Sequence, residues 1–284
     1  MFSFWVTLNT KQVHLRTELP EIAALILEGF AAMLGAEKQP VIAQFLILYE
    51  NQKYHLINQD SGQTIKIIDD SGHCFIHLKY YVMTALIEAN AQWLWFHAGA
   101  VANDDGAIIL PAAAGGGKST FTTYFAQQGW QYCSDDVVPL DFYAQQIYPV
   151  PQTPRPRAVT AAILSPEQLA LVEKQAISLT PPQISDRPHG IQAIVFPYYQ
   201  PDVETQLYPC STGKSVIRLL ENCINFPVHK RQAMPFLVKL MEAVHRFELV
   251  YSDRLVACDA LWQLAQQNWQ MEHAPVTPQP QAPI

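Results

Sequence analysis

Apolar and polar positions follow two different periods in the first third of the chain. Apolar residues recur at helical spacing over 20–34, where Pro20 suits a first helical turn, and again over 77–90. Between these two segments, short apolar runs separated by turn residues predict an antiparallel meander. The three predicted strands are 44–49, 53–57 and 64–68. Residues 1–75 are therefore expected to form a small N-terminal α+β accessory region.

Two apolar runs in the middle of the chain predict a hairpin. Residues 93–102 and 107–110 flank Asn103–Gly106, whose residue types are typical of a turn. The second run leads into a glycine-rich segment and then into residues that can continue as a helix. Further elements are predicted as a strand at 191–196 and helices at 212–222, 235–246 and 256–268. A larger catalytic domain is expected over 76–272, followed by a disordered Pro- and Gln-rich tail at 273–284.

Composition limits the kind of protein this can be. The chain has 284 residues, of which 49% are hydrophobic and 15% charged, which supports a sizeable core and argues against general disorder. The net charge is -7, and no dense run of Lys and Arg occurs, so nucleic acid is not an expected partner.

Cysteine usage and hydropathy indicate the compartment. The five cysteines are scattered, and none forms the Cys-x-x-Cys pair typical of zinc sites, so we expect reduced thiols. No apolar run approaches the roughly 18 residues that a membrane span needs. The start of the chain lacks a basic segment followed by a long apolar one. We therefore expect a cytoplasmic protein without a membrane span.

The glycine-rich segment at 111–120 carries the strongest chemical signal. A strand, a glycine-rich turn and a helix start are the context of a phosphate-binding (Walker A) loop, because glycines allow backbone N–H groups to close around phosphate oxygens. Lys118 is predicted to reach the β- and γ-phosphates, and the Ser119 hydroxyl to help hold Mg²⁺. One departure is Ala112, where the pattern asks for glycine. The predicted nucleotide-binding residues are Ala114, Gly115, Gly116, Gly117, Lys118, Ser119 and Thr120.

An acidic pair downstream supplies candidates for catalysis. Asp135 and Asp136 follow a short apolar strand, and Asp135 lies 17 residues after Lys118. One carboxylate of such a pair can hold Mg²⁺ and the other can accept a proton from an attacking hydroxyl. The alternative is an exposed turn or a helix cap. His97, beside the predicted hairpin, is a further candidate, although a lone histidine there is often a packed or capping residue.

Together these segments resemble the catalytic core of the HPr kinase/phosphorylase family, and most closely its shorter HPr-kinase-related kinases. The resemblance is carried by His97-Ala-Gly-Ala-Val, Gly115-Gly-Gly-Lys-Ser-Thr120, Gly129-Trp-Gln-Tyr-Cys-Ser-Asp-Asp136 and Pro154-Arg155-Pro156. The resemblance is strong over residues 93–157, and before residue 75 it gives little information. It implies an α/β (α+β) fold with a P-loop kinase core of the HPr kinase and phosphoenolpyruvate carboxykinase-like type, and it suggests a homo-oligomer.

The resemblance also implies roles for individual residues. Asp135 matches the residue that takes the proton from a substrate serine, and Asp136 the second acidic position, which supports Mg²⁺. His97 corresponds to the family histidine near the phosphates. Our own inference adds Arg155, which a rigid Pro-Arg-Pro segment could hold over the phosphates; the alternative is a solvated arginine. The predicted catalytic residues are therefore Asp135, Lys118, His97 and Arg155, and the predicted metal ligands are Ser119 and Asp136.

The expected activity is that of a kinase that transfers the γ-phosphoryl group of ATP, with Mg²⁺, to a hydroxyl. Serine of a peptide or small protein is the favoured acceptor. Two alternatives stay open: a small-molecule kinase of the same fold, and a nucleotide-binding regulatory protein without catalysis. An exposed groove beside the loop would favour a peptide, and a closed pocket a metabolite. Arg187-Pro-His-Gly-Ile191 matches the family's Arg-Gly-Leu-Gly-Ile segment poorly, so phosphorolysis and HPr itself are not expected.

Overall fold

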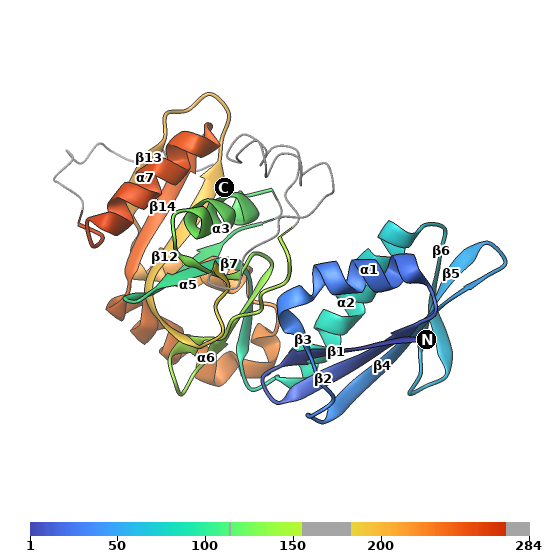
Figure 1. Ribbon diagram of the computed structural model, residues 1–284. Coiled ribbons are helices and arrows are strands. Elements are labelled where there is room, and N and C mark those ends of the chain that lie inside the picture. The colour runs from blue at the N-terminus through green and yellow to red at the C-terminus, as the bar shows by residue number, and fades with distance from the viewer. Residues whose placement is uncertain (114, 155–182, 271–284) are drawn as a thin grey trace.

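The chain folds into two α/β parts that lie side by side (Figure 1). The structure is a computed structural model that describes residues 1–113, 115–154 and 183–270. In these ranges each part contains one mixed β-sheet with helices packed against it. No helix in the described ranges is both long and apolar enough to cross a membrane.

The first sheet has the strand order β3-β1-β2-β4-β5-β6. Its strands are β1 (Phe2–Leu8), β2 (Lys11–Thr17), β3 (Leu34–Gly35), β4 (Val41–Glu50), β5 (Lys53–Asn58) and β6 (Gln63–Ile68). Strands β2 and β4 pair in parallel, and the other neighbours are antiparallel. The predicted meander is confirmed as β4-β5-β6. The hairpin β1-β2 was not predicted; Asn9, with φ 53°, lies in its turn.

Two helices cover one face of this sheet, α1 (Pro20–Gly29) and α2 (Ser71–Ala89). Helix α1 is shorter than predicted, and residues Ala31–Met33 form a separate 3₁₀ turn. It approaches α2 so closely that a Cβ on Gly29 would lie 2.2 Å from the Phe75 ring. Helix α2 begins six residues earlier than predicted, because the Asp70 side chain accepts a hydrogen bond from the His73 amide and caps the first turn.

The second sheet has the order β11-β10-β7-β8-β12-β14-β13, and β9 pairs with β7. Its strands are β7 (Leu94–Asn103), β8 (Gly106–Pro111), β9 (Gln131–Ser134), β10 (Val137–Asp141), β11 (Gln146–Ile147), β12 (His189–Tyr199), β13 (Gln206–Pro209) and β14 (His245–Tyr251). Strand β12 runs parallel to both β8 and β14, whereas the other pairings are antiparallel. The β7-β8 hairpin agrees with the sequence prediction.

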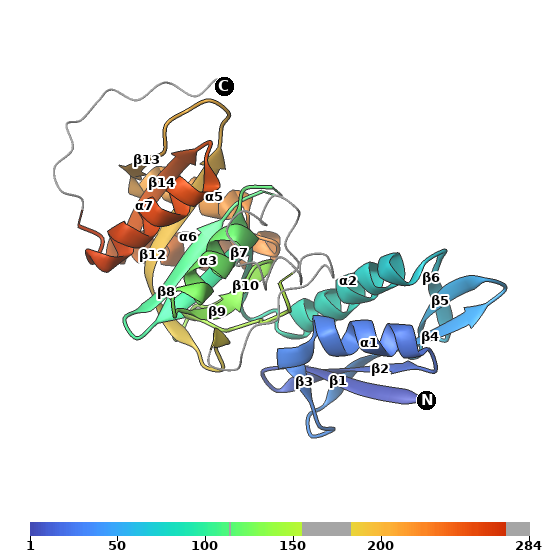
Figure 2. The same cartoon turned by 45° about the horizontal axis from the view of Figure 1, so that its top comes forward.

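Helices cover both faces of the second sheet (Figure 2). Helices α3 (Lys118–Gln127) and α7 (Arg254–Gln266) pack on one face, and α5 (Thr212–Glu221) and α6 (Phe226–Ala243) on the other. The alternation of a strand explains this: in β8, Ile108 and Leu110 join the α3 and α7 side, and Ile109 joins the other. The helix predicted to start at residue 235 is corrected to α6, which begins at Phe226 and keeps Pro235 within it.

One hydrophobic core joins the two parts. Trp93, Trp95, Val137 and Val150, from in and around the second sheet, are buried in the same cluster as α1, α2 and the first sheet. The Trp95 indole N–H also donates to the Asn90 carbonyl at 3.1 Å, just after α2. The boundary predicted at residue 75 falls inside α2, and the division into domains stays a prediction.

Candidate active site

The glycine-rich segment connects the end of β8 to the start of α3. Gly115 and Gly117 have φ angles of 88° and 83°, which lie in the left-handed region that favours glycine. Gly117 is the N-cap of α3, so Lys118 and Ser119 occupy its first turn. The first-turn amide groups of a helix point out of its N-terminus and favour an anion there. The predicted order of strand, turn and helix is present, and Thr120 in the first turn of α3 is buried.

Gly116 makes room for the alanine that departs from the loop pattern. A Cβ on Gly116 would lie 2.7 Å from the Ala112 Cβ and 3.2 Å from the Ala113 carbonyl oxygen. Real Cβ atoms do not approach another carbon so closely. The methyl group of Ala112 is therefore accommodated by the absent side chain at 116.

The Lys118 ammonium is folded back onto the loop. The residue is only 7% exposed, and its Nζ donates to the carbonyls of Ala112 at 2.7 Å and Ala113 at 3.1 Å. It also lies 3.0 Å from His97 Nε2. A buried ammonium needs such partners because desolvation is costly for an unpaired charge. The site thus holds a positive charge at the loop.

Strand register brings His97 to this position. Ala98 pairs with Pro111 across β7-β8, so His97 lies beside Ala112, one residue further along. On the other edge of β7, His97 pairs with Val137 of β10. The histidine therefore lies between the loop and the acidic pair, which the sequence could suggest only by motif order.

The contacts of His97 determine which tautomer its neutral imidazole adopts. Because Lys118 can only donate, Nε2 must accept, and the proton then lies on Nδ1, which faces Asp136 Oδ1 at 3.5 Å. Burial, and next the neighbouring Lys118 charge, lower the pKa of His97, while Asp136 acts in the opposite direction. Lys118, His97 and Asp136 form one line of polar contacts.

Asp135 is held by a tyrosine that the sequence analysis did not single out. The buried Tyr132 hydroxyl donates to Asp135 Oδ1 at 2.8 Å or to the Gln152 carbonyl at 3.0 Å. Burial, and then the Asp135 charge, hold the pKa of Tyr132 well above its ordinary value, so the hydroxyl remains a donor. Tyr132 lies in a short strand that is buried at three successive positions, and nothing in the sequence indicates the partner of its hydroxyl.

A second missed residue packs under the loop. Tyr251, at the end of β14, is buried, and its hydroxyl lies 2.4 Å from where a Cβ on Gly117 would be. Its ring meets Phe121 of α3 edge to face, with the centroids 5.6 Å apart. The end of β14 therefore supports the N-terminus of α3 and requires glycine at 117.

The donor set suits a magnesium ion bound with phosphates. Ser119 and Asp136 are half-buried and can offer a hydroxyl and a carboxylate. The described residues contain no group of three or more His, Cys, Asp or Glu side chains that could hold a metal ion. Mg²⁺ usually takes one or two carboxylates and completes its shell with substrate phosphates and water. The residues present fit that mode, and their metal role stays a prediction.

Two predicted residues lie outside the described part of the chain, Ala114 and Arg155, as does the tail 273–284. A second Gly-Lys-Ser sequence, in Thr212-Gly-Lys-Ser215, resembles the loop sequence at 117–119. It forms the first turn of α5, which is capped by the Ser211 side chain. There Lys214 pairs with the buried Glu248 at 2.6 Å. This second Gly-Lys-Ser is therefore a helix start.

Comparisons with known proteins give a weak result. No protein-family model matches the chain, and no curated protein matches it. Among solved structures, it is similar to the Hpr(Ser) kinase/phosphatase from Coxiella burnetii, with 9% sequence identity over 61% of this chain and 97% of that chain. The TM-score is 0.27, so this is a weak similarity at the level of the fold.

The contact between positions 112 and 116 predicts the outcome of a double substitution. Gly116→Ala should lower the free energy of unfolding by about 1–3 kcal/mol, because it overpacks the loop. Adding Ala112→Gly should recover most of that loss, since it removes the clashing methyl group. Urea denaturation of Gly116→Ala, Ala112→Gly and the double variant measures this coupling.

Gly213→Ala is the matched control, because a Cβ there meets nothing within 4 Å. It should leave stability unchanged or raise it by about 0.4–1 kcal/mol. Additive effects of the substitutions at 112 and 116 would contradict the proposed contact.

The lowered pKa of His97 predicts a pH dependence of stability. An unfolded histidine titrates near pH 6.5, as a general value, and the folded His97 below it. Between these two pKa values the unfolded chain binds more protons than the folded protein. The free energy of unfolding therefore falls as the pH drops through this window, and the contribution of neutral His97 to stability is fully present above it.

His97→Gln removes this titration and should flatten the loss below about pH 6.5. Denaturation midpoints of both proteins, measured across that range, give the difference. The comparison cancels other groups such as His189, whose pKa is also lowered. Parallel curves for the two proteins would show that His97 does not titrate in this way.

Proposed function

We propose that this protein is a P-loop kinase that transfers the γ-phosphoryl group of ATP, with Mg²⁺, to a hydroxyl group. Serine in a peptide or small protein is the favoured acceptor. The proposal is supported by one observation above all: the line of contacts from Lys118 through His97 to Asp136. Three residues that are separate in the sequence meet at the N-terminus of a helix that follows a glycine-rich turn.

Each residue has a task in this mechanism. The α3 N-terminus and Lys118 bind the β- and γ-phosphates, for which the ammonium must exchange the loop carbonyls for phosphate oxygens. Bound Mg²⁺ would neutralise the charge of the phosphate oxygens, with Ser119 and Asp136 as its protein ligands. Neutral His97 accepts from Lys118 and so directs the ammonium.

Asp135 is the proposed general base. The acceptor hydroxyl oxygen attacks the γ-phosphorus, its proton passes to Asp135, the bond from the γ-phosphorus to the bridging oxygen breaks, and ADP leaves. The Tyr132 hydroxyl holds one oxygen of Asp135. The carboxylate is thereby kept in one orientation for the acceptor, which supports this assignment over that of a solvent-exposed turn.

The first test is nucleotide binding. Lys118→Met should weaken the binding of Mg·ATP, measured by calorimetry, by at least about a hundredfold, because a charge-assisted contact to phosphate is lost. Lys214→Met is the matched control, since it alters the other Gly-Lys-Ser segment and leaves Glu248 paired with Arg218. Equal affinity in both variants, or no binding by folded wild type, would overturn the phosphate-loop assignment.

The second test separates catalysis from binding. Asp135→Asn should lower kcat for phosphoryl transfer by about a hundredfold or more, because the amide cannot take the proton. Binding of Mg·ATP should be largely retained. Asp104→Asn, in the exposed turn between β7 and β8, is the control and should transfer at the wild-type rate. Strong transfer by Asp135→Asn would remove Asp135 from the role of base.

A further inference from the structure

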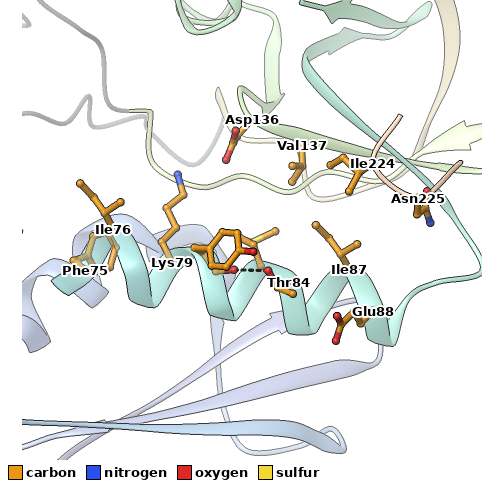
Figure 3. A pocket seen from close by; sticks show the side chains of 12 residues that line it. Phe75, Ile76, Lys79, Thr84, Ile87, Glu88, Asp136, Val137, Ile224 and Asn225 are labelled. Atoms are coloured by element: carbon orange, nitrogen blue, oxygen red, sulfur yellow. Dashed lines mark hydrogen bonds between the residues drawn. The ribbon is translucent and has the colours of Figure 1, made fainter. Parts of the chain in front are cut away.

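An open groove runs along α2 and is lined on its other side by Asp136 of the candidate active site. Its volume is about 670 Å³. One wall is the face of α2 between Phe75 and Glu88, and the other is formed by Asp136, Val137, Ile224 and Asn225 (Figure 3). The core shared by the two parts, with Trp95 and Val137 in it, holds these walls against each other.

The groove is apolar where it is most exposed. Ile76 is 57% exposed and Tyr80 63%, and both lie on the groove side of α2. Leaving two large apolar side chains side by side in water is unfavourable, and such patches commonly mark binding surfaces. The exposure also distinguishes this groove from a closed metabolite pocket. An elongated ligand with apolar side chains fits it better than a small polar one.

Asp136 connects the groove to the phosphoryl-transfer residues. Its carboxylate lines the groove and lies 3.5 Å from His97 Nδ1, and His97 in turn contacts Lys118. A ligand in the groove therefore passes beside the residues that are predicted to hold the γ-phosphate. This continuity makes the groove a place for the acceptor and not for the nucleotide.

Opposite charges mark different places along the groove. Lys79 and Glu88 both line the groove; Lys79 points across it toward the wall that contains Asp136, whereas Glu88 lies at the other end of the α2 wall (Figure 3). Neither Lys79 nor Glu88 makes a salt bridge with another described residue. Nine residues of helix separate them by about 14 Å, which an extended peptide spans with about four residues.

We propose that this groove binds the acceptor as an extended peptide, with the hydroxyl residue beside Asp136. An acidic residue of the peptide lies beside Lys79, apolar residues lie on Ile76 and Tyr80, and a basic residue about four positions from the acidic one lies beside Glu88. The inference rests on the proposed kinase function and specifies its substrate class. The alternative occupants, a small hydroxyl compound and a second copy of this chain, are outcomes of the test.

The experiment uses a positional-scanning library of serine decapeptides with labelled Mg·ATP, and free serine as a small acceptor. Wild type should prefer an acidic residue near the serine and a basic residue further away. Lys79→Glu should reverse the near preference from acidic to basic, by about tenfold or more in kcat/KM. Glu88→Lys should reverse the far preference only. A merely structural role of either residue would not exchange one charge preference for the other.

A matched pair of double variants tests the apolar contacts. Ile76→Ala with Tyr80→Ala should raise KM for the best peptide by about tenfold and change kcat little, because binding is lost equally in the ground and transition states. The control is Tyr49→Ala with Ile67→Ala, at the same residue types, 49% and 54% exposed, on β4 and β6 outside the groove. It should leave both constants unchanged.

Several results would overturn the inference. Unaltered charge preferences in Lys79→Glu, or equal KM values for the two double variants, would remove the peptide from the groove. Phosphorylation of free serine but of no peptide would do the same and leave the kinase function intact. A wild-type dimer that dissociates only in Ile76→Ala with Tyr80→Ala, with peptide use unaltered, would assign the groove to a second copy. Failure of wild type to bind Mg·ATP would overturn the kinase function and this inference together.

Discussion

The candidate active site depends on the burial of one positive charge. The Lys118 ammonium is almost fully withdrawn from water, and this is tolerable only because carbonyl oxygens and an imidazole nitrogen take the place of solvent. The loop must therefore turn the carbonyls of Ala112 and Ala113 inward. The left-handed angles of Gly115 and Gly117 and the missing side chain at Gly116 permit that path. Burial, and next this same charge, lower the pKa of His97, so loop geometry and the protonation of His97 are connected.

The register of the second sheet positions His97 between the loop and the acidic pair. Strand β7 lies between β8, which leads into the loop, and β10, which follows the acidic pair. One residue of β7, His97, is therefore adjacent to both. A shift of one residue in either pairing would turn that side chain to the opposite face of the sheet. The contacts from Lys118 through His97 to Asp136 are therefore a consequence of backbone pairing, which brings these side chains within contact distance of one another.

The sequence indicated the local parts of this site and not their surroundings. The hairpin, the turn and the start of α3 follow from apolar runs and glycines that act over a few residues. The donor from Tyr132 to Asp135, the support of Gly117 by Tyr251, and the groove between α2 and Asp136 are contacts between distant segments, so no local pattern reveals them. The start of α2 was misplaced because its cap, Asp70, lies before the apolar period begins. The start of α6 was misplaced because Pro235 sits inside that helix.

The shared core of the two parts has a consequence for how such a protein can change over evolution. Trp93 and Trp95 belong by chain position to the second sheet, and they are buried among residues of the first. If the first ninety residues were replaced by an unrelated domain, the two indole rings at the start of β7 would be exposed to solvent. The N-terminal part therefore cannot be exchanged independently of the second sheet. Substitutions at exposed positions of α2 leave this core intact, whereas the buried side of the same helix is under a packing constraint.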